Sequence, residues 1–267
     1  MDNLFLILSF IFGAVVGSFL NVVILRLPLG RSLSGRSYCP SCGHVLGFLD
    51  LFPILSFIVL RGRCRYCSAK ISPRYWIIEL VLGLLFAVTW LYLLPASPGS
   101  ALRLFQYWFL ESLLLAVFVI DLEHYLILDQ IIFPGCAVAV AVNLGLDFFS
   151  GQAVLSPSSH LVSGFLGALV LAGLFFGVWY FSKGQWMGFG DVKLAVFLGL
   201  GLAWPLAGVG LMLAVLLGGL VSIFLLIFGG KTLKTRLPFG TFLSLGAVLS
   251  LFYGEKLLAW YLAFLGF

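Results

Sequence analysis

The stretch Met187-Gly188-Phe189-Gly190-Asp191-Val192-Lys193-Leu194 places a carboxylic acid directly before an apolar run that extends from Leu194 to Leu202. Its two glycines lack a Cβ atom, which permits a tight turn and lets another segment approach closely. A carboxylate at the border of an apolar segment is costly in lipid, so an acid in this position usually has a function. Asp191 also fits a helix N-cap, but the flanking glycines favour close contact with a second group.

The composition around this stretch is that of a membrane protein. The chain has 267 residues, 62% of them hydrophobic and 9% charged, and apolar runs occupy nearly everything outside residues 24–75. This predicts a polytopic membrane protein without a large soluble domain. The net charge of +5 is small and does not indicate nucleic-acid binding. The N-terminal run lacks a basic segment and a clear cleavage site, so we expect a retained first span.

Eight apolar runs approach the length of a bilayer-spanning helix, which takes roughly 20 residues. We therefore predict an all-α fold of about eight transmembrane helices, the shortest being the one after Asp191. The runs are 4–25, 76–94, 104–120, 130–148, 161–181, 192–204, 206–228 and 242–267. We expect three regions. Residues 1–94 hold the first two spans and a polar loop, 104–228 form the membrane domain with Asp191, and 229–267 form a C-terminal loop and last span.

The positions of the basic residues predict the orientation. The only extended polar segment, 26–75, is cytoplasmic by the positive-inside rule, and both termini then lie on the outer side of a bacterial inner membrane. Segments 121–129, 182–191 and 229–238 join it on the cytoplasmic side. Basic residues on that side are Arg26, Arg31, Arg36, Arg61, Arg63, Arg65, Lys70, Arg74, Lys183, Lys193, Lys231, Lys234 and Arg236, against Arg103 and Lys256 on the other. The short apolar stretch Leu49–Leu60 predicts an interfacial or re-entrant piece.

A second acid is expected on the same side of the membrane as Asp191, within the segment 121–129. Asp129 precedes an apolar helix and fits an N-cap. Asp121 lies at the end of a helix, where the macrodipole disfavours an anion, so a functional interpretation is favoured. We predict that Asp121 and Asp191 meet at the cytoplasmic border of the membrane.

Two carboxylates that meet in a partly dry site cannot both ionise cheaply and therefore share a proton. One is then the general base that activates water, and the other donates a proton to the carbonyl oxygen and later to the leaving amine. This is aspartic-protease chemistry, which needs neither a metal nor a nucleophilic side chain. No pattern of a serine hydrolase, a zinc protease or a P-loop competes with it.

Four of the five cysteines form two Cys-x-x-Cys pairs: Cys39, Cys42, Cys64 and Cys67. Their spacing is that of a structural zinc site, in which four thiolates close the coordination sphere. Arg63 and Arg65 would favour the thiolate form. Four free thiols or a disulfide are the alternatives. Such a closed site organises a zinc-ribbon-like loop between the first and second spans and would not hydrolyse peptides.

Other polar residues have simpler interpretations. Asn21 needs a partner, most simply in another helix. Glu123 and His124 are expected in a solvated loop, and His44 in the cysteine loop without a role as a metal ligand. Cys136 lies in an apolar span and is expected to serve packing.

The chain resembles the bacterial prepilin peptidases, the type IV leader peptidases of the GxGD aspartic class. The resemblance runs in order over nearly the whole chain. It is carried by 17–28 (GSFLNVVILRLP), the two cysteine pairs, 71–75 (ISPRY), 121–124 (DLEH), 188–194 (GFGDVKL) and 237–240 (LPFG). One departure is Leu128, where the family usually has a proline, and it puts the local turn in doubt.

The resemblance implies that Asp121 and Asp191 are the catalytic pair. It also implies removal of the basic leader from type IV prepilins or type II secretion pseudopilins, followed by N-methylation of the new N-terminus with S-adenosylmethionine. The sequence shows no methyl-donor fingerprint, so the second activity follows from the resemblance alone. Two alternatives remain: a GxGD peptidase with another membrane substrate, and a proton-coupled transporter. Transport predicts acids near the bilayer midplane and paired broken helices.

Overall fold

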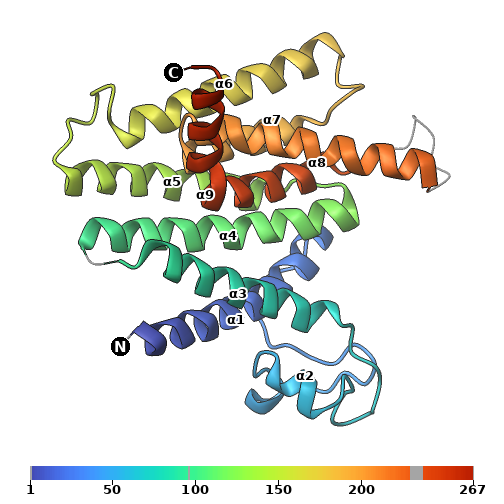
Figure 1. Ribbon diagram of the computed structural model, residues 1–267. Coiled ribbons are helices and arrows are strands. Elements are labelled where there is room, and N and C mark those ends of the chain that lie inside the picture. The colour runs from blue at the N-terminus through green and yellow to red at the C-terminus, as the bar shows by residue number, and fades with distance from the viewer. Residues whose placement is uncertain (1, 96, 229–236, 267) are drawn as a thin grey trace. The chain divides into compact units, whose positions relative to one another are not determined.

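The computed structural model describes residues 2–95, 97–228 and 237–266, which form helices joined by loops (Figure 1). Seven helices among these residues are long and apolar enough to cross a membrane, which confirms the predicted all-α membrane fold. The eighth expected span is helix α7 (Phe189–Leu202), whose 14 residues extend about 21 Å. This is shorter than the hydrocarbon core of about 30 Å. The chain divides into two compact units, Met1–Pro95 and Ala96–Phe267.

The first unit is built on two helices, α1 (Asp2–Arg26) and α3 (Arg74–Leu93), which pack against each other. Glycines on α1 allow the close approach. A Cβ atom added at Gly13 would lie 2.7 Å from the backbone oxygen of Leu82, and one at Gly17 would lie 2.8 Å from Cα of Glu79. Asn21 Nδ2 donates to the backbone oxygen of Tyr75 on α3 at 3.0 Å. The expected interhelical hydrogen bond of Asn21 is therefore confirmed.

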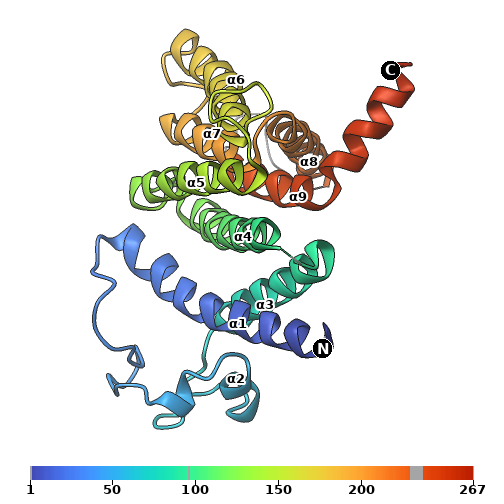
Figure 2. The same ribbon diagram turned by 90° about the vertical axis from the view of Figure 1, so that its left-hand side faces the viewer.

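The polar loop between α1 and α3 carries only short helical turns: η1 (Leu27–Leu29), η2 (Phe48–Asp50) and α2 (Leu55–Val59). The apolar stretch Leu49–Leu60 therefore does not cross the membrane, as expected. Figure 2 shows this loop beside the α1–α3 pair within the first unit. Its attachment to α3 includes the backbone N–H of Ile54, which donates to Oε2 of the buried Glu79 at 2.8 Å.

In the described residues of the second unit, six helices pack together, with α7 in the interior. The other five are α4 (Pro98–His124), α5 (Asp129–Ser150), α6 (His160–Phe181), α8 (Leu206–Phe228) and α9 (Phe239–Phe264). Helix α7 contacts α5, α6, α8 and α9, and nine of its residues are buried. Cys136 on α5 packs against Ala139, Ala168 and Leu200, which confirms its expected packing role. A helix too short to span the bilayer is thus covered by its neighbours.

Side-chain amides satisfy the carbonyl groups at the C-terminal end of α7, which have no partner within the helix. Asn143 Nδ2 donates to the backbone oxygen of Leu200 at 2.9 Å, and Gln106 Nε2 donates to that of Gly201 at 3.1 Å. Gln106 also donates to Asn143 Oδ1 at 3.3 Å. Helices α4 and α5 therefore hold the far end of α7, and a rigid α7 fixes the position of Asp191 at its start.

Candidate active site and cysteine centre

Asp121 lies in the last turn of α4, as the sequence predicted. Its backbone oxygen accepts a hydrogen bond from the N–H of Tyr125 at 2.9 Å. Tyr125 ends the helix in a left-handed conformation with φ 56°. The side chain of Asp121 is buried, with the residue only 5% exposed. A buried carboxylate at a helix C-terminus needs donors from another element.

The beginning of α9 supplies those donors. The backbone N–H of Thr241 donates to Asp121 Oδ2 at 2.7 Å, and its hydroxyl donates to the same oxygen at 3.2 Å. The first N–H groups of a helix have no partner within it, so they form a natural anion site. A Cβ atom added at Gly240 would lie 2.9 Å from Asp121 Oδ2. Glycine at this position therefore lets α9 approach the carboxylate.

Asp191 is in the first turn of α7, and Gly188 is the N-cap. Interpreting Asp191 as an N-cap is therefore wrong. The close approach expected at the two glycines is found at Gly190, where an added Cβ would lie 3.0 Å from Cβ of Ile127. Ile127 also lies beside Gly240, at 3.1 Å from an added Cβ. The connection between α4 and α5 thus packs against the starts of both α7 and α9.

The two predicted acids come together at one end of the second unit. Both acids lie beside Ile127 of the α4–α5 connection: Ile127 is 3.0 Å from a Cβ added at Gly190, the residue before Asp191, and 3.1 Å from one added at Gly240, which itself would lie 2.9 Å from Asp121 Oδ2. Asp121 is buried and Asp191 is half-buried, which leaves Asp191 the more accessible of the two. Three elements distant in sequence, α4, α7 and α9, therefore bring the two carboxylates to the same end of the second unit.

The other polar residues near this end agree only in part with expectation. The N-cap of α5 is Leu128 in an extended conformation, and Asp129 is the first helical residue. Its expected capping role is therefore wrong: the Asp129 carboxylate instead pairs with Lys193 Nζ at 2.5 Å, which ties the start of α5 to α7. Glu123 and His124 are exposed as expected, but they belong to the last turn of α4 and not to a loop.

In the first unit, the four predicted metal ligands come together. The sulfur atoms of Cys39, Cys42, Cys64 and Cys67 all lie within 4.8 Å of one another. Cys39 Sγ and Cys67 Sγ are 3.8 Å apart. A tetrahedral zinc ion with Zn–S distances of about 2.3 Å separates its sulfurs by about 3.8 Å. The thiol set therefore fits a closed structural zinc site.

The two cysteine pairs have the same backbone conformation. The N–H of Gly43 donates to the oxygen of Cys39 at 2.8 Å, and the N–H of Ser68 donates to that of Cys64 at 2.9 Å. Gly43 and Ser68 both have positive φ, 71° and 60°. Backbone N–H groups of Cys42 and Ser41 lower the pKa of the Cys39 thiol to about 6, which favours the thiolate that a metal requires. Each pair therefore forms a tight turn whose two sulfur atoms can coordinate a metal ion.

Asp50 joins the two halves of the cysteine loop. Its carboxylate accepts from Arg65 Nε at 2.7 Å, from the Tyr66 hydroxyl at 3.1 Å and from the backbone N–H of Gly47 at 3.0 Å. Burial alone would raise the pKa of Asp50, but these donors outweigh it and lower the pKa below its usual value. His44 stacks on the Tyr66 ring with centroids 3.6 Å apart, consistent with its expected place outside the ligand set.

Two functional residues were missed in the sequence. Thr241 follows the motif 237–240, so its neighbourhood was marked, but no pattern linked it to Asp121 across 120 positions of chain. Asp50 sits in the apolar stretch 49–60, where an isolated acid could have been read as the partner of a nearby arginine. The basic residues 231, 234 and 236 of the predicted cytoplasmic loop lie outside the described residues.

Comparison of the chain with known proteins shows which family it belongs to. Residues 11–93 match the bacterial peptidase A24 N-terminal domain, and residues 108–227 match the type IV leader peptidase family. The chain is 33% identical to a prepilin leader peptidase/N-methyltransferase of Aeromonas hydrophila, over 97% of this chain and 94% of the relative. The chain belongs to the type IV leader peptidase family.

Two further relatives of this leader peptidase carry the same description. The protein of Pseudomonas putida is 32% identical over 98% of this chain and 96% of its own length. That of Myxococcus xanthus is 37% identical over 85% of this chain and 65% of its own length. No solved structure matches the chain. The aspartic chemistry inferred from the two carboxylates agrees with the A24 peptidase family.

Proposed function

We propose that this protein removes the basic leader of type IV prepilins or type II secretion pseudopilins at the cytoplasmic border of the inner membrane, with Asp121 and Asp191 as the catalytic pair. The observation that carries the proposal is the convergence of α4, α7 and α9 on these two carboxylates. Family membership supports the peptidase activity, and the relatives described as prepilin leader peptidases support the substrate class.

The hydrogen bonds favour different roles for the two acids. Oδ2 of Asp121 accepts both donors of Thr241, so it is occupied as an acceptor and does not itself carry a proton. A proton shared by the pair then lies on Asp191 or on Oδ1 of Asp121. We assign the base that activates water to Asp121. The more accessible Asp191 then protonates the carbonyl oxygen of the scissile bond, recovers that proton when the tetrahedral intermediate collapses, and passes it to the leaving amine.

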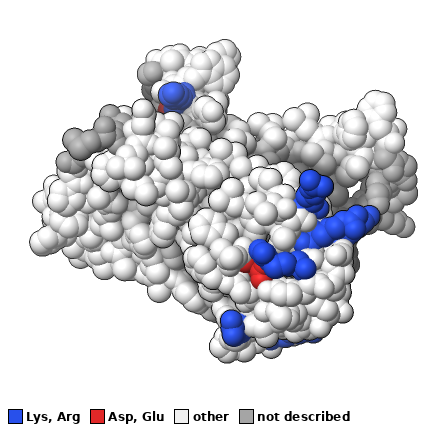
Figure 3. Space-filling model, turned by 90° about the horizontal axis from the view of Figure 1, so that it is seen from below, with Lys and Arg blue, Asp and Glu red and all other residues white. Residues whose placement is uncertain are grey.

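The distribution of charge supports a cytoplasmic cysteine loop. Figure 3 shows Lys and Arg side chains gathered on the face viewed, with little acidic surface among them. The sequence of the loop in the first unit contains Arg31, Arg36, Arg61, Arg63, Arg65 and Lys70. By the positive-inside rule this loop lies in the cytoplasm, where the leader of a prepilin also remains. A transport function is not favoured, because Asp121 lies at the end of its helix and not near a bilayer midplane.

The proposal assigns residues to a structural zinc ion but none to the methyl donor. Cys39, Cys42, Cys64 and Cys67 would hold a structural zinc, which closes the loop and takes no part in peptide hydrolysis. Methylation of the new N-terminus rests on similarity to the relatives alone. We assign none of the described residues to S-adenosylmethionine.

The proposal is tested with purified protein and a model prepilin in detergent, followed by mass spectrometry. Loss of the leader mass is the expected product without any added cofactor. A further gain of one methyl group is expected only when S-adenosylmethionine is added. An intact prepilin after incubation with folded protein would contradict the proposed substrate. Cleavage without methylation would contradict only the proposed methyltransferase activity.

A further inference from the structure

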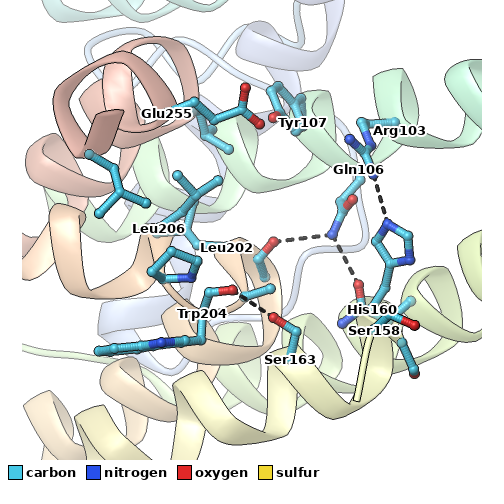
Figure 4. A pocket seen from close by; sticks show the side chains of 17 residues that line it. Arg103, Gln106, Tyr107, Ser158, His160, Ser163, Leu202, Trp204, Leu206 and Glu255 are labelled. Atoms are coloured by element: carbon cyan, nitrogen blue, oxygen red, sulfur yellow. Dashed lines mark hydrogen bonds between the residues drawn. The ribbon is translucent and has the colours of Figure 1, made fainter. Parts of the chain in front are cut away.

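A cavity lies at the end of the second unit opposite the two aspartates (Figure 4). It encloses about 320 Å³ above the C-terminal end of α7, among α4, α6, the α7–α8 turn and α9. Its origin is the short length of α7, which stops at Leu202 where its neighbours continue. The volume is at the lower end of the range for ligand pockets, about 300–1,000 Å³. It suits a small polar group and not a whole lipid.

One side of the cavity carries a fixed cation. Asp147, fully buried, accepts from the hydroxyl of Ser159 at 2.6 Å and from His160 Nδ1 at 3.0 Å. Arg103 Nη2 donates to His160 Nε2 at 2.8 Å. Because arginine can only donate, His160 Nε2 is the acceptor of this bond, and Nδ1 faces the Asp147 carboxylate. This chain of bonds orients the guanidinium of Arg103, and most of its five N–H groups have no partner among the described residues.

The other side of the cavity carries an anion. Glu255 on α9 lines the cavity across from Arg103, as Figure 4 shows. Its carboxylate has no hydrogen-bond or ion-pair partner in the part of the chain that the structure describes. A cation and an anion that face one small cavity without pairing to each other match a zwitterion of complementary charge.

The position of the cavity along α4, relative to the bilayer, indicates which molecule could supply such a zwitterion. Arg103 precedes Asp121 by 18 residues on α4, which is about 27 Å along the helix axis. This nearly equals the hydrocarbon thickness of about 30 Å. If Asp121 lies at one border of the bilayer, Arg103 lies at the other, at the level of lipid headgroups. Trp204, a residue type enriched at that level, also lines the cavity.

We propose that this cavity binds the phosphoethanolamine group of a zwitterionic phospholipid. Arg103 contacts the phosphate, and Glu255 contacts the ammonium. The acyl chains stay in the bilayer, since the cavity admits the headgroup alone. The bound headgroup links α4 to α9, the two helices that meet again at Asp121 and Thr241. This inference does not depend on the proposed peptidase activity, because it concerns the opposite end of the unit.

The test is native mass spectrometry of the full-length protein released from detergent micelles that contain equal amounts of phosphatidylethanolamine and phosphatidylglycerol. We expect the wild-type protein to retain phosphatidylethanolamine about fivefold or more over phosphatidylglycerol. This ratio is the change in affinity that one partly exposed ion pair, between Glu255 and the ammonium, would contribute. Glu255→Gln should lose this preference and still retain both lipids. Arg103→Gln should lose retention of both. Lys256→Gln, which changes a charge beside Glu255 but outside the cavity, should behave as wild type.

Competition with soluble phosphoethanolamine shows whether the cavity binds the free phosphoethanolamine group or only that group as part of a membrane lipid. Displacement of the lipid by millimolar phosphoethanolamine would show that the headgroup alone suffices, and failure to displace would show that binding needs the membrane lipid. The inference is overturned if the wild-type protein retains the two lipids equally, or if Glu255→Gln keeps the preference. The melting temperature of each variant shows whether it is folded. If Arg103→Gln does not fold, Glu255→Gln, a change at an exposed residue, decides the test.

Discussion

The substitution Thr241→Val tests whether α9 holds Asp121 in its catalytic state. Valine has nearly the shape of threonine and keeps the backbone N–H that donates to Oδ2 at 2.7 Å. It removes only the hydroxyl, which donates to Oδ2 at 3.2 Å and also lies 3.4 Å from the backbone oxygen of Phe118. The variant therefore isolates one hydrogen bond to the proposed base.

The size of the effect follows from the geometry. A hydrogen bond to a charged group contributes about 1.5–3 kcal/mol. At 3.2 Å this bond is longer than the usual O–H···O distance of about 2.7–2.8 Å, and its proton is shared with a second acceptor. We therefore expect a loss of about 1.5 kcal/mol, which corresponds to about a tenfold fall in kcat. KM should change little, because Thr241 contacts Asp121 and is not proposed to contact the substrate.

The assay is the rate of leader removal from a model prepilin, followed by mass spectrometry, with the melting temperature as the measure of folding. Thr241→Ser keeps the hydroxyl and should recover most of the rate. Ser244→Ala is the matched control, because Ser244 is buried one turn further along α9 and its hydroxyl has no partner among the described residues. Wild-type kcat in folded Thr241→Val, or an equal loss in Ser244→Ala, would refute this role of the hydroxyl.

Three further substitutions have expected outcomes. Gly240→Ala places a Cβ 2.9 Å from Asp121 Oδ2 and should lower kcat by about 10²-fold with the protein still inserted; near-normal turnover would contradict the close approach. Asp50→Asn should weaken the cysteine loop by about 1.5 kcal/mol, seen as faster limited proteolysis. Because the pKa of Asp50 is lowered in the fold, the difference from wild type should be complete above pH of about 4 and disappear as pH falls below the lowered value. Cys64→Ser should reduce bound zinc from about one equivalent without a direct effect on peptide chemistry, and a folded variant that retains full metal would count against the site.

Much of the fold could be predicted from sequence because hydropathy reports directly on membrane crossing. The expected runs 76–94 and 104–120 correspond to α3 and α4, although α4 begins earlier, at Pro98. Helix α7 shows the limit of this approach. Its apolar run suggested a short span, but burial by four neighbouring helices, and not contact with lipid, explains its composition.

The candidate site was predictable only in part. Asp121 and Asp191 drew attention because each lies at an unfavourable border for a charge, and Gly190 correctly indicated a close neighbour. The identity of that neighbour, Ile127, depends on tertiary packing. So does the role of Thr241, which is set by where α9 begins relative to α4. The capping role predicted for Asp129 was wrong because local propensity carries no information about a lysine 64 positions away.

The most direct test of the central claim is leader cleavage by Asp121→Asn and Asp191→Asn, measured beside Asp129→Asn in folded, membrane-inserted protein. Each of the first two changes removes a carboxylate of the pair and should abolish cleavage, since neither amide can exchange the proton that the reaction requires. Asp129→Asn keeps an oxygen that can accept from Lys193 and should retain substantial activity. Cleavage at the wild-type rate by Asp121→Asn or by Asp191→Asn would contradict the assignment of the catalytic pair.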